Sequence, residues 1–187
     1  MNVSLPATAA TFGYLSAVES SELGYFGGYL LVSPLGRPLE FHCTAPIRPS
    51  RAQEILYGPT LQPYLLGEQI AGTLLAKART KPQIILTDQP NALCHRVKVD
   101  VPIVGWRAQA ADETGIIAPE FAHLLLISGH AFELAAGFEA DRELAAALLA
   151  RLAEHVDLPE PFARIHDAIC EAHRIGDRGP ETQSEAA

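Results

Sequence analysis

The sequence predicts a single α/β domain built on a mixed sheet, and three observations support this. Apolar runs at 26–32 and 39–44 flank a compact turn, SPLGR, in which proline sets the first corner and glycine permits a left-handed conformation. A long apolar helical segment follows at about 60–79. The strand, short helix and strand of a parallel unit come next, at 82–106.

Length and composition fit this fold class. At 187 residues, of which 48% are hydrophobic and 19% charged, the chain has room for one substantial core. No apolar run approaches the roughly 18 residues of a membrane span, and the first ten residues lack the pattern of a signal peptide. Three widely spaced cysteines suit reduced thiols. We therefore expect a cytoplasmic protein with no membrane partner.

The net charge of −8 is unevenly distributed along the chain. Residues 37–107 carry nine basic and five acidic residues, whereas residues 108–187 carry five basic and fifteen acidic ones. Solvated helix faces near the C-terminus explain this asymmetry. A mildly basic face that meets an anionic or acidic partner is the alternative explanation.

The sheet is expected to open with an antiparallel meander. Residues 11–19 have the pattern of a first strand. The run at 26–32 is apolar at nearly every position, so it is expected to be covered on both faces and to place the hairpin in the middle of the sheet. In the run at 39–44, apolar and polar residues alternate, as in a half-buried strand.

The helical segment that follows contains one unusual residue. Ser50 is a good N-cap for a short helix at 51–57, with Glu54 near the third helical position as in a capping box. On a wheel of 100° per residue, Glu68 falls on the apolar side of the helix at 60–79. A carboxylate there needs a compensating partner. The candidates are a bound metal ion or the positively charged side chain of Arg37, Arg48 or His42.

The second half of the chain continues the α/β pattern. A buried strand at 82–87 ends at Asp88, and a short helix at 91–96 leads to a strand at 99–106. Apolar runs at 121–128 and 131–136 suggest another hairpin, and helices are expected at 138–156 and 162–174. Residues 177–187 are polar and acidic, so we expect a disordered tail after a single domain at 1–176.

Signatures of common enzyme classes are absent. The chain has no GxGxxG after a strand, no phosphate loop, and no CxxC, HExxH or GxSxG motif. Two Cys/His pairs, at 42–43 and 94–95, invite a metal site, but neighbouring strand residues point to opposite faces. Cys94 beside His95 is the better candidate for a cysteine nucleophile, which needs a nearby base.

The order of the elements gives a more specific hypothesis. Three strands, a long helix, a strand, a short helix and a strand resemble the ribonuclease H-like fold. That fold holds divalent cations with acids from the first strand, the following helix and the end of the fourth strand. Glu19, Glu68 and Asp88 stand at roughly those places. The resemblance implies that they are catalytic, with Glu68 and Asp88 as metal ligands for Mg²⁺ or Mn²⁺.

An aromatic cluster provides a candidate binding surface. Tyr25, Phe26 and Tyr29 surround two glycines, and glycines inside a strand often mark a place where a ligand or another backbone comes close. Arg37 in the following turn completes this candidate set. Ordinary core packing is the alternative explanation.

Two functional hypotheses follow. Because the polar candidates are scattered, the leading one is a non-catalytic binding or scaffold module that acts through a protein partner and has no cofactor. The alternative is a metal-dependent phosphodiesterase or nuclease of ribonuclease H-like form, with nucleic acid as its partner. The first expects Glu68 to be tied to a cation inside the core. The second expects Glu19, Glu68 and Asp88 to converge.

Overall fold

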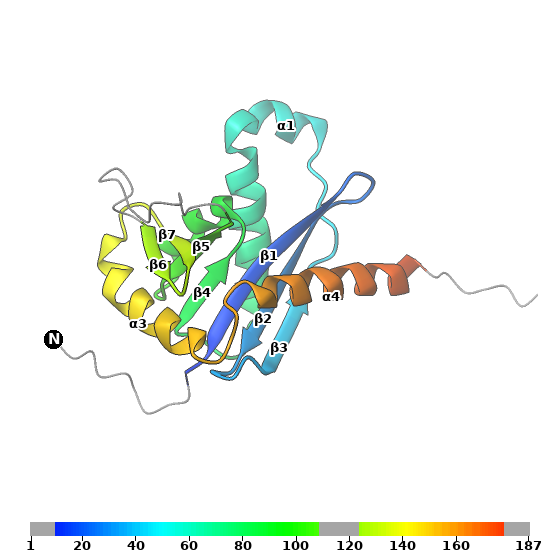
Figure 1. The fold of residues 1–187 in the computed structure, drawn as a ribbon. Coiled ribbons are helices and arrows are strands. Elements are labelled where there is room, and N and C mark those ends of the chain that lie inside the picture. The colour runs from blue at the N-terminus through cyan, green and yellow to red at the C-terminus, as the bar shows by residue number, and fades with distance from the viewer. Residues whose placement is uncertain (1–9, 109–123, 178–187) are drawn as a thin grey trace, which may run out of the picture.

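Seven strands form one mixed sheet in the order β3-β2-β1-β4-β5-β7-β6 (Figure 1). The structure is a computed structural model that describes residues 10–108 and 124–177. β1 pairs antiparallel with β2 and parallel with β4, so it lies near the middle of the sheet. The strands are β1 (Phe12–Ser20), β2 (Gly24–Val32), β3 (Pro38–Cys43), β4 (Ile84–Thr87), β5 (Ile103–Arg107), β6 (Leu124–Ile127) and β7 (His130–Leu134).

The predicted meander is present, but its position in the sheet differs from the expectation. β2 is buried on both faces, as its apolar run predicts. The hairpin is nevertheless not central, because β3 is an edge strand with exposed Leu39 and Phe41. Burial on both faces shows only that helices lie above and below a strand. It does not fix the number of strands on either side.

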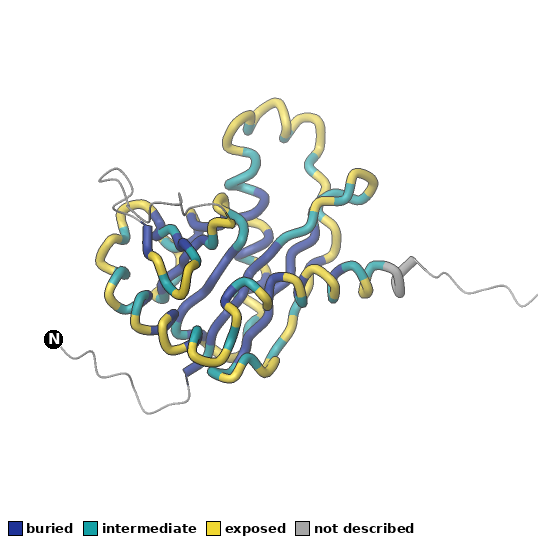
Figure 2. Tube along the Cα trace, in the orientation of Figure 1, coloured by how far each residue is buried: buried dark blue, intermediate teal, exposed yellow. Residues whose placement is uncertain are grey.

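Two helical layers cover the two faces of the sheet (Figure 2). The first, called here the α4 layer, consists of α3 (Arg142–Ala153) and α4 (Glu160–Asp177), with the short turn η5 (Glu139–Asp141) before α3. The second, called here the η2 layer, consists of the π-helix η2 (Pro63–Ala71), α2 (Gly72–Lys77) and the 3₁₀ helix η3 (Pro90–Lys98). The predicted helices at 138–156 and 162–174 thus form the α4 layer.

Two adjacent glycines in β2 let both layers approach the strand. A Cβ on Gly27 would lie 2.1 Å from Ile70 of η2. A Cβ on Gly28 would lie 2.4 Å from Ile165 of α4. Their role is therefore close packing of helices on both faces and not the approach of a ligand.

The helix predicted at 60–79 is a succession of three helix types. A 3₁₀ turn, η1 (Gly58–Thr60), leads into the π-helix η2, which continues into α2. Hydrogen bonds in a π-helix run from i to i+5, so each turn holds more residues than an α-helical turn. Leu65, Leu66 and Ile70 of η2 are buried, whereas Glu68 is exposed. Leu66, Ile70 and Leu74 follow one another at intervals of four residues, and Glu68 lies on the opposite side of the helix.

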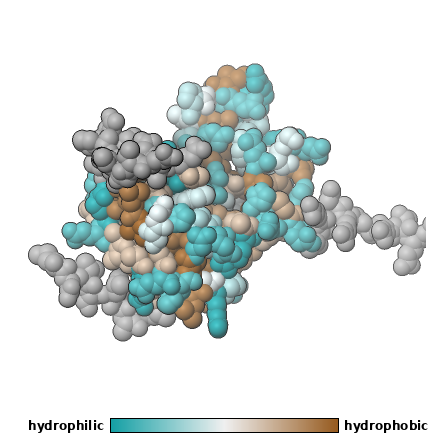
Figure 3. Space-filling model, in the orientation of Figure 1, coloured by the Kyte–Doolittle hydropathy of each residue, from teal (hydrophilic) through white to brown (hydrophobic). Residues whose placement is uncertain are grey.

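One short helix stands away from the sheet. α1 (Arg51–Tyr57) buries none of its residues and projects from the body of the molecule (Figures 1 and 2). Apolar surface lies there in Figure 3, where Ile55 and Leu56 are exposed. The predicted cap at Ser50 is confirmed, although the reciprocal capping-box residue is Gln53 and not Glu54.

The remaining elements match the predicted order. β4, η3 and β5 form the expected parallel unit, and β6 and β7 form the expected antiparallel hairpin. Of the predicted tail at 177–187, only Asp177 lies within the described residues, where it ends α4. Among the described helices, none combines the length and the apolar character that crossing a membrane requires.

Candidate functional site

The strongest candidate is Asp88, which follows directly after β4. Leu15 of β1 is paired with Thr87 of β4, so the next residues along the two parallel strands, Ser16 and Asp88, are neighbours. The Ser16 hydroxyl donates a 2.8 Å hydrogen bond to Asp88 Oδ2, and the Gln89 amide donates one of 3.2 Å to Oδ1. Ligands of open α/β sheets bind at this carboxyl end of the strands.

The surroundings of Asp88 act on its carboxyl group in opposite directions. Burial raises the pKa of Asp88, whereas the hydrogen bonds from Ser16 and Gln89 and the nearby His166 lower it. Ser16 is buried and His166 is exposed on α4. The His166 ring contacts Asp167 and Cys170, each at 3.8 Å, so its effect on Asp88 is long-range electrostatics and not a hydrogen bond or an ion pair. The Asp88 carboxylate, held by Ser16 and Gln89, is a group that can hold a cation.

Sequence analysis assigned no role to His166 or Ser16. Ile165 and Ile169 bury the stripe of α4 that packs on the sheet, which leaves His166 on its exposed flank. No local pattern marks this residue, since only the crossing of α4 over the sheet brings it toward Asp88. Ser16 can be recognised as a neighbour of Asp88 only once the register between β1 and β4 is known.

Glu68 lies away from this site. Its carboxylate is 2.9 Å from Lys98 Nζ, and both side chains are about half exposed. It belongs to the η2 layer, whereas the buried residues on the same strand face as Ser16 and Asp88, such as Tyr14 and Leu86, pack with the α4 layer. The predictions of a core carboxylate and of a partner among Arg37, Arg48 and His42 are wrong. Glu68 lies about half a helical turn from the buried residues Leu66 and Ile70, on the side that faces solvent.

Glu19 also fails to join Asp88. It lies three residues beyond Ser16 along β1, and its carboxylate accepts a 2.9 Å hydrogen bond from the Tyr25 hydroxyl. Throughout residues 10–108 and 124–177, no group of three His, Cys, Asp or Glu side chains is placed to hold a metal ion. The structure therefore does not assemble Glu19, Glu68 and Asp88 into one cluster.

The site still meets a minimal requirement for a divalent cation. Mg²⁺ in phosphoryl-transfer sites binds through one or two carboxylates, completed by waters and substrate phosphates. Asp88 supplies one carboxylate, and the neighbouring Ser16 hydroxyl is a neutral oxygen. The residues present fit an ion that binds together with a phosphate-bearing substrate, and do not fit a preformed cage of several acids.

The predicted aromatic binding surface is not formed. Phe26 is buried in the α4 layer against His173, whereas Tyr29 is buried on the opposite face. The Tyr25 hydroxyl is engaged by Glu19 and by Gln62, which donates to it at 2.8 Å. Arg37 is exposed in the turn after β2. Alternation along the strand separates side chains that are neighbours in the sequence.

The cysteine candidates lack the features of a nucleophile. Burial raises the pKa of the Cys94 thiol, which disfavours the reactive thiolate. That thiol donates to the Asn91 carbonyl oxygen at 3.1 Å, while the side chain of His95 is buried. Cys43 is exposed on the edge strand and not part of the core.

Comparison with solved structures identifies the fold. No protein-family model matches the sequence, and no curated protein matches it. A crystal structure of an endonuclease V variant from Ciona intestinalis, in complex with a 23mer DNA containing an inosine followed by a ribo-adenosine, superposes with a TM-score of 0.54. The match has 16% identity and covers 90% of this chain and 88% of that chain.

Two further structures agree with this likeness. Endonuclease V from Ciona intestinalis with a 24mer DNA gives a TM-score of 0.53 at 14% identity, over 90% of this chain and 88% of that chain. Endonuclease V from Bacillus subtilis gives 0.52 at 13% identity, over 88% and 83%. The fold of this chain is therefore the ribonuclease H-like α/β fold that the order of elements suggested.

These likenesses correct the leading functional prediction. A non-catalytic module acting through a protein partner is the wrong interpretation, because the solved structures with this fold are nucleases and two of them hold DNA. The polar residues appeared scattered in the sequence because Ser16 and Asp88 meet only through the register between β1 and β4.

Proposed function

We propose that this chain cleaves phosphodiester bonds in nucleic acid at the carboxyl end of β4, with Asp88 as the essential carboxylate. The observation that carries the proposal is the position of Asp88, which is held by Ser16 of β1 and follows the last residue of β4. The likeness of the whole fold to endonuclease V structures supports the same reaction class.

A divalent ion, Mg²⁺ or Mn²⁺, is part of this proposal. When bound, it would polarise a phosphate oxygen and activate water. Asp88 would hold it, together with phosphate oxygens of the nucleic acid. Because one carboxylate alone binds such an ion weakly, we expect metal and nucleic acid to bind cooperatively.

The neighbouring side chains have distinct tasks in the proposed reaction. Ser16 and Gln89 each donate a hydrogen bond to one Asp88 oxygen, which fixes the orientation of the carboxylate. Glu19 and Glu68 have no place in this arrangement, since each is paired elsewhere.

A cleavage assay with matched variants tests the proposal. The first substrate is a DNA that contains an inosine followed by a ribo-adenosine, the kind of strand bound in the Ciona complex. The same strand without inosine and an RNA strand complete the substrate set. We expect cleavage with Mg²⁺ or Mn²⁺ and a loss of roughly 1000-fold in Asp88→Asn, since a lost metal contact removes several kcal/mol of transition-state stabilisation.

The variants Glu19→Gln and Glu68→Gln serve as controls for the three-acid hypothesis. We expect both to cleave at the parent rate, because neither carboxylate lies with Asp88. Undiminished cleavage by Asp88→Asn would overturn the proposal. So would the absence of cleavage of all three strands with either ion.

A further inference from the structure

A cavity lies at the opposite end of β4 from Asp88. It has a volume of about 310 Å³ and opens between the end of α2, the residues that lead into β4 and the segment after η3. Apolar side chains form much of its wall, among them Leu75, Pro82, Ile85, Val99 and Val101. Ligand pockets begin at about this size and are lined mainly by apolar side chains with a few polar groups.

The rim of this cavity is positively charged. Arg79, Lys81 and Lys98 line it together with a single carboxylate, that of Asp100. Lys81 is 3.3 Å from Asp100 with both side chains largely exposed, a contact that stabilises little and leaves the ammonium accessible. Arg79 makes no ion pair with any residue of the described segments, so its guanidinium is available to an anion.

The loop that presents Arg79 is held in place from the edge strand. The Glu40 carboxylate of β3 accepts hydrogen bonds from the backbone N–H groups of Arg79, at 2.7 Å, and Thr80, at 3.2 Å. His42 contacts the same carboxylate. A loop fixed in this way loses little conformational entropy when a ligand binds.

We propose that this cavity binds a small organic phosphate of nucleoside monophosphate size. The phosphate would lie on the guanidinium of Arg79 and the ammonium of Lys81, since guanidinium groups bind phosphate through two parallel hydrogen bonds. The ring system would lie against Leu75, Ile85 and Val99. A purely polar anion leaves the apolar wall uncovered, and a neutral apolar compound leaves the cations unpaired.

This site is separate from the proposed cleavage site. Asp88 follows the last residue of β4, whereas Pro82 and the loop at 79–81 precede its first residue. The side chains also belong to different layers, because Ile85 packs with the η2 layer. The inference therefore does not depend on nuclease activity.

Titration calorimetry with the full chain tests the proposal. The probes are AMP and GMP, adenosine without a phosphate, inorganic phosphate without a ring, and a short 5′-phosphorylated oligonucleotide. We expect the mononucleotides to bind at least about tenfold more tightly than adenosine or phosphate, since they use both the wall and the rim. If the oligonucleotide binds as tightly as the mononucleotides, the natural ligand is the 5′ end of a strand. If it binds more weakly than they do, the natural ligand is a free nucleotide.

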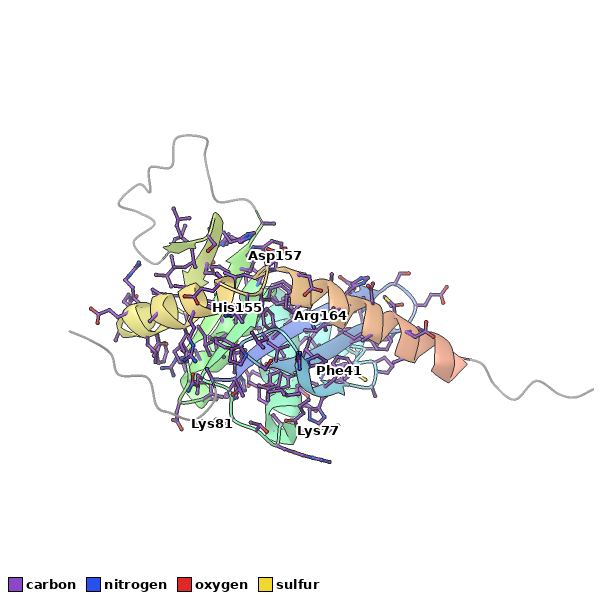
Figure 4. All side chains as sticks on the ribbon, turned by 60° about the horizontal axis from the view of Figure 1, so that its bottom comes forward. Phe41, Lys77, Lys81, His155, Asp157 and Arg164 are labelled. Atoms are coloured by element: carbon purple, nitrogen blue, oxygen red, sulfur yellow. The ribbon has the colours of Figure 1, made fainter. Side chains whose placement is uncertain are left out.

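Matched variants separate a formed site from general surface charge. Arg79→Ala should weaken mononucleotide binding by about tenfold or more through loss of a charge-assisted contact. Ala78→Phe should also weaken it by filling the cavity, which Ala78 lines. Lys77→Ala is the control, because Lys77 is an exposed cation one residue from Ala78 that does not line the cavity (Figure 4).

The outcomes distinguish this inference from the proposed nuclease function. Asp88→Asn should bind mononucleotides as the parent does, even though it loses cleavage. Equal weakening by Lys77→Ala and Arg79→Ala would show nonspecific attraction and overturn the proposal. Mononucleotide binding that is unchanged in Ala78→Phe, with the fold verified by circular dichroism, would also overturn the proposal. A parent protein that binds neither AMP nor GMP would overturn it as well.

Discussion

The two helical layers cover the same sheet with very different helices. The α4 layer uses two regular α-helices, and the buried residues Phe162, Ile165 and Ile169 recur at the spacing of an α-helical stripe. The η2 layer uses 3₁₀, π and α geometry, although its buried residues Leu66, Ile70 and Leu74 also recur at intervals of four. The two layers therefore differ in helix type and not in whether the sequence shows a buried stripe.

The difference extends to the candidate sites. Asp88 lies on the face of the sheet that packs with the regular layer, where rigid elements can hold a functional group in a fixed geometry. The cationic cavity lies with the irregular layer, where the end of α2 and the residues after η3 leave space beside the sheet. If this comparison is correct, mutations in the two layers should have unequal effects.

The largest effect is expected where the layers are joined. Arg96 of η3 donates to both Asp141 oxygens, at 2.7 and 3.0 Å, just before α3, and its guanidinium lies over Phe138 at 4.2 Å. Both charged side chains are about seven-eighths buried. Arg96→Ala leaves Asp141 without this partner and should lower the free energy of unfolding by about 3 kcal/mol, measured by urea denaturation.

Lys98→Ala is the control for this prediction. The Lys98–Glu68 pair is half exposed, so its loss should cost less than about 1 kcal/mol. Similar losses in the two variants would mean that Arg96 does not couple the layers.

A smaller effect is expected at the two glycines of β2. Each of Gly27→Ala and Gly28→Ala introduces a Cβ that overlaps an isoleucine of one layer, and overpacking costs about 1–3 kcal/mol. We expect Gly27→Ala to cost less, although its Cβ approaches more closely, because the π-helix can shift while α4 is held by a regular stripe. A larger loss for Gly27→Ala in the same denaturation assay would show that the η2 layer is as rigid as the α4 layer.

The smallest effect is expected from pH, and its sign differs between the layers. Burial lowers the pKa of His95 in the η2 layer from 6.5, so the unfolded chain takes up the proton first. Stability should fall as pH decreases through about 6.5. Burial raises the pKa of Asp88 from 3.8, so the folded chain retains its proton longer, and stability should fall as pH rises above about 4.

Melting temperatures of matched variants over pH 4 to 8 check both signs. His95→Gln should lack the loss of stability on the acid side. Asp88→Asn should gain stability relative to the parent near neutral pH, because an ionised and partly buried carboxylate is removed. Parallel pH profiles for parent and variants would contradict both assignments.

The sequence predicted what local patterns control. The turn after β2 has Gly36 with a φ of 71°, Ser50 caps α1, and Asp88 ends a buried strand, all as expected. Each of these features depends on residues within a few positions of one another. The order of the elements also sufficed to suggest the ribonuclease H-like fold, which the solved structures support.

The sequence did not predict what depends on geometry across the fold. The wheel placed Glu68 in the core because every apolar residue of the helix was counted as buried, whereas Leu61, Tyr64 and Leu75, its neighbours on the wheel, are only partly buried. Ser16 has no local signal, and it adjoins Asp88 only through the β1–β4 register. A conformation of single residues can be inferred from neighbours, whereas such a meeting of side chains needs the tertiary structure.

The Ser16–Asp88 hydrogen bond also bears on how the molecule folds. It joins residues 72 positions apart, whereas β1, β2 and β3 are consecutive and pair through short turns. Pairings between distant residues carry a larger loop-closure entropy and form more slowly than local ones. The meander can thus form early, while the docking of β4 comes late. During synthesis, before the β4 segment is free to fold, the chain could contain the folded strands β1, β2 and β3 but would lack the candidate site.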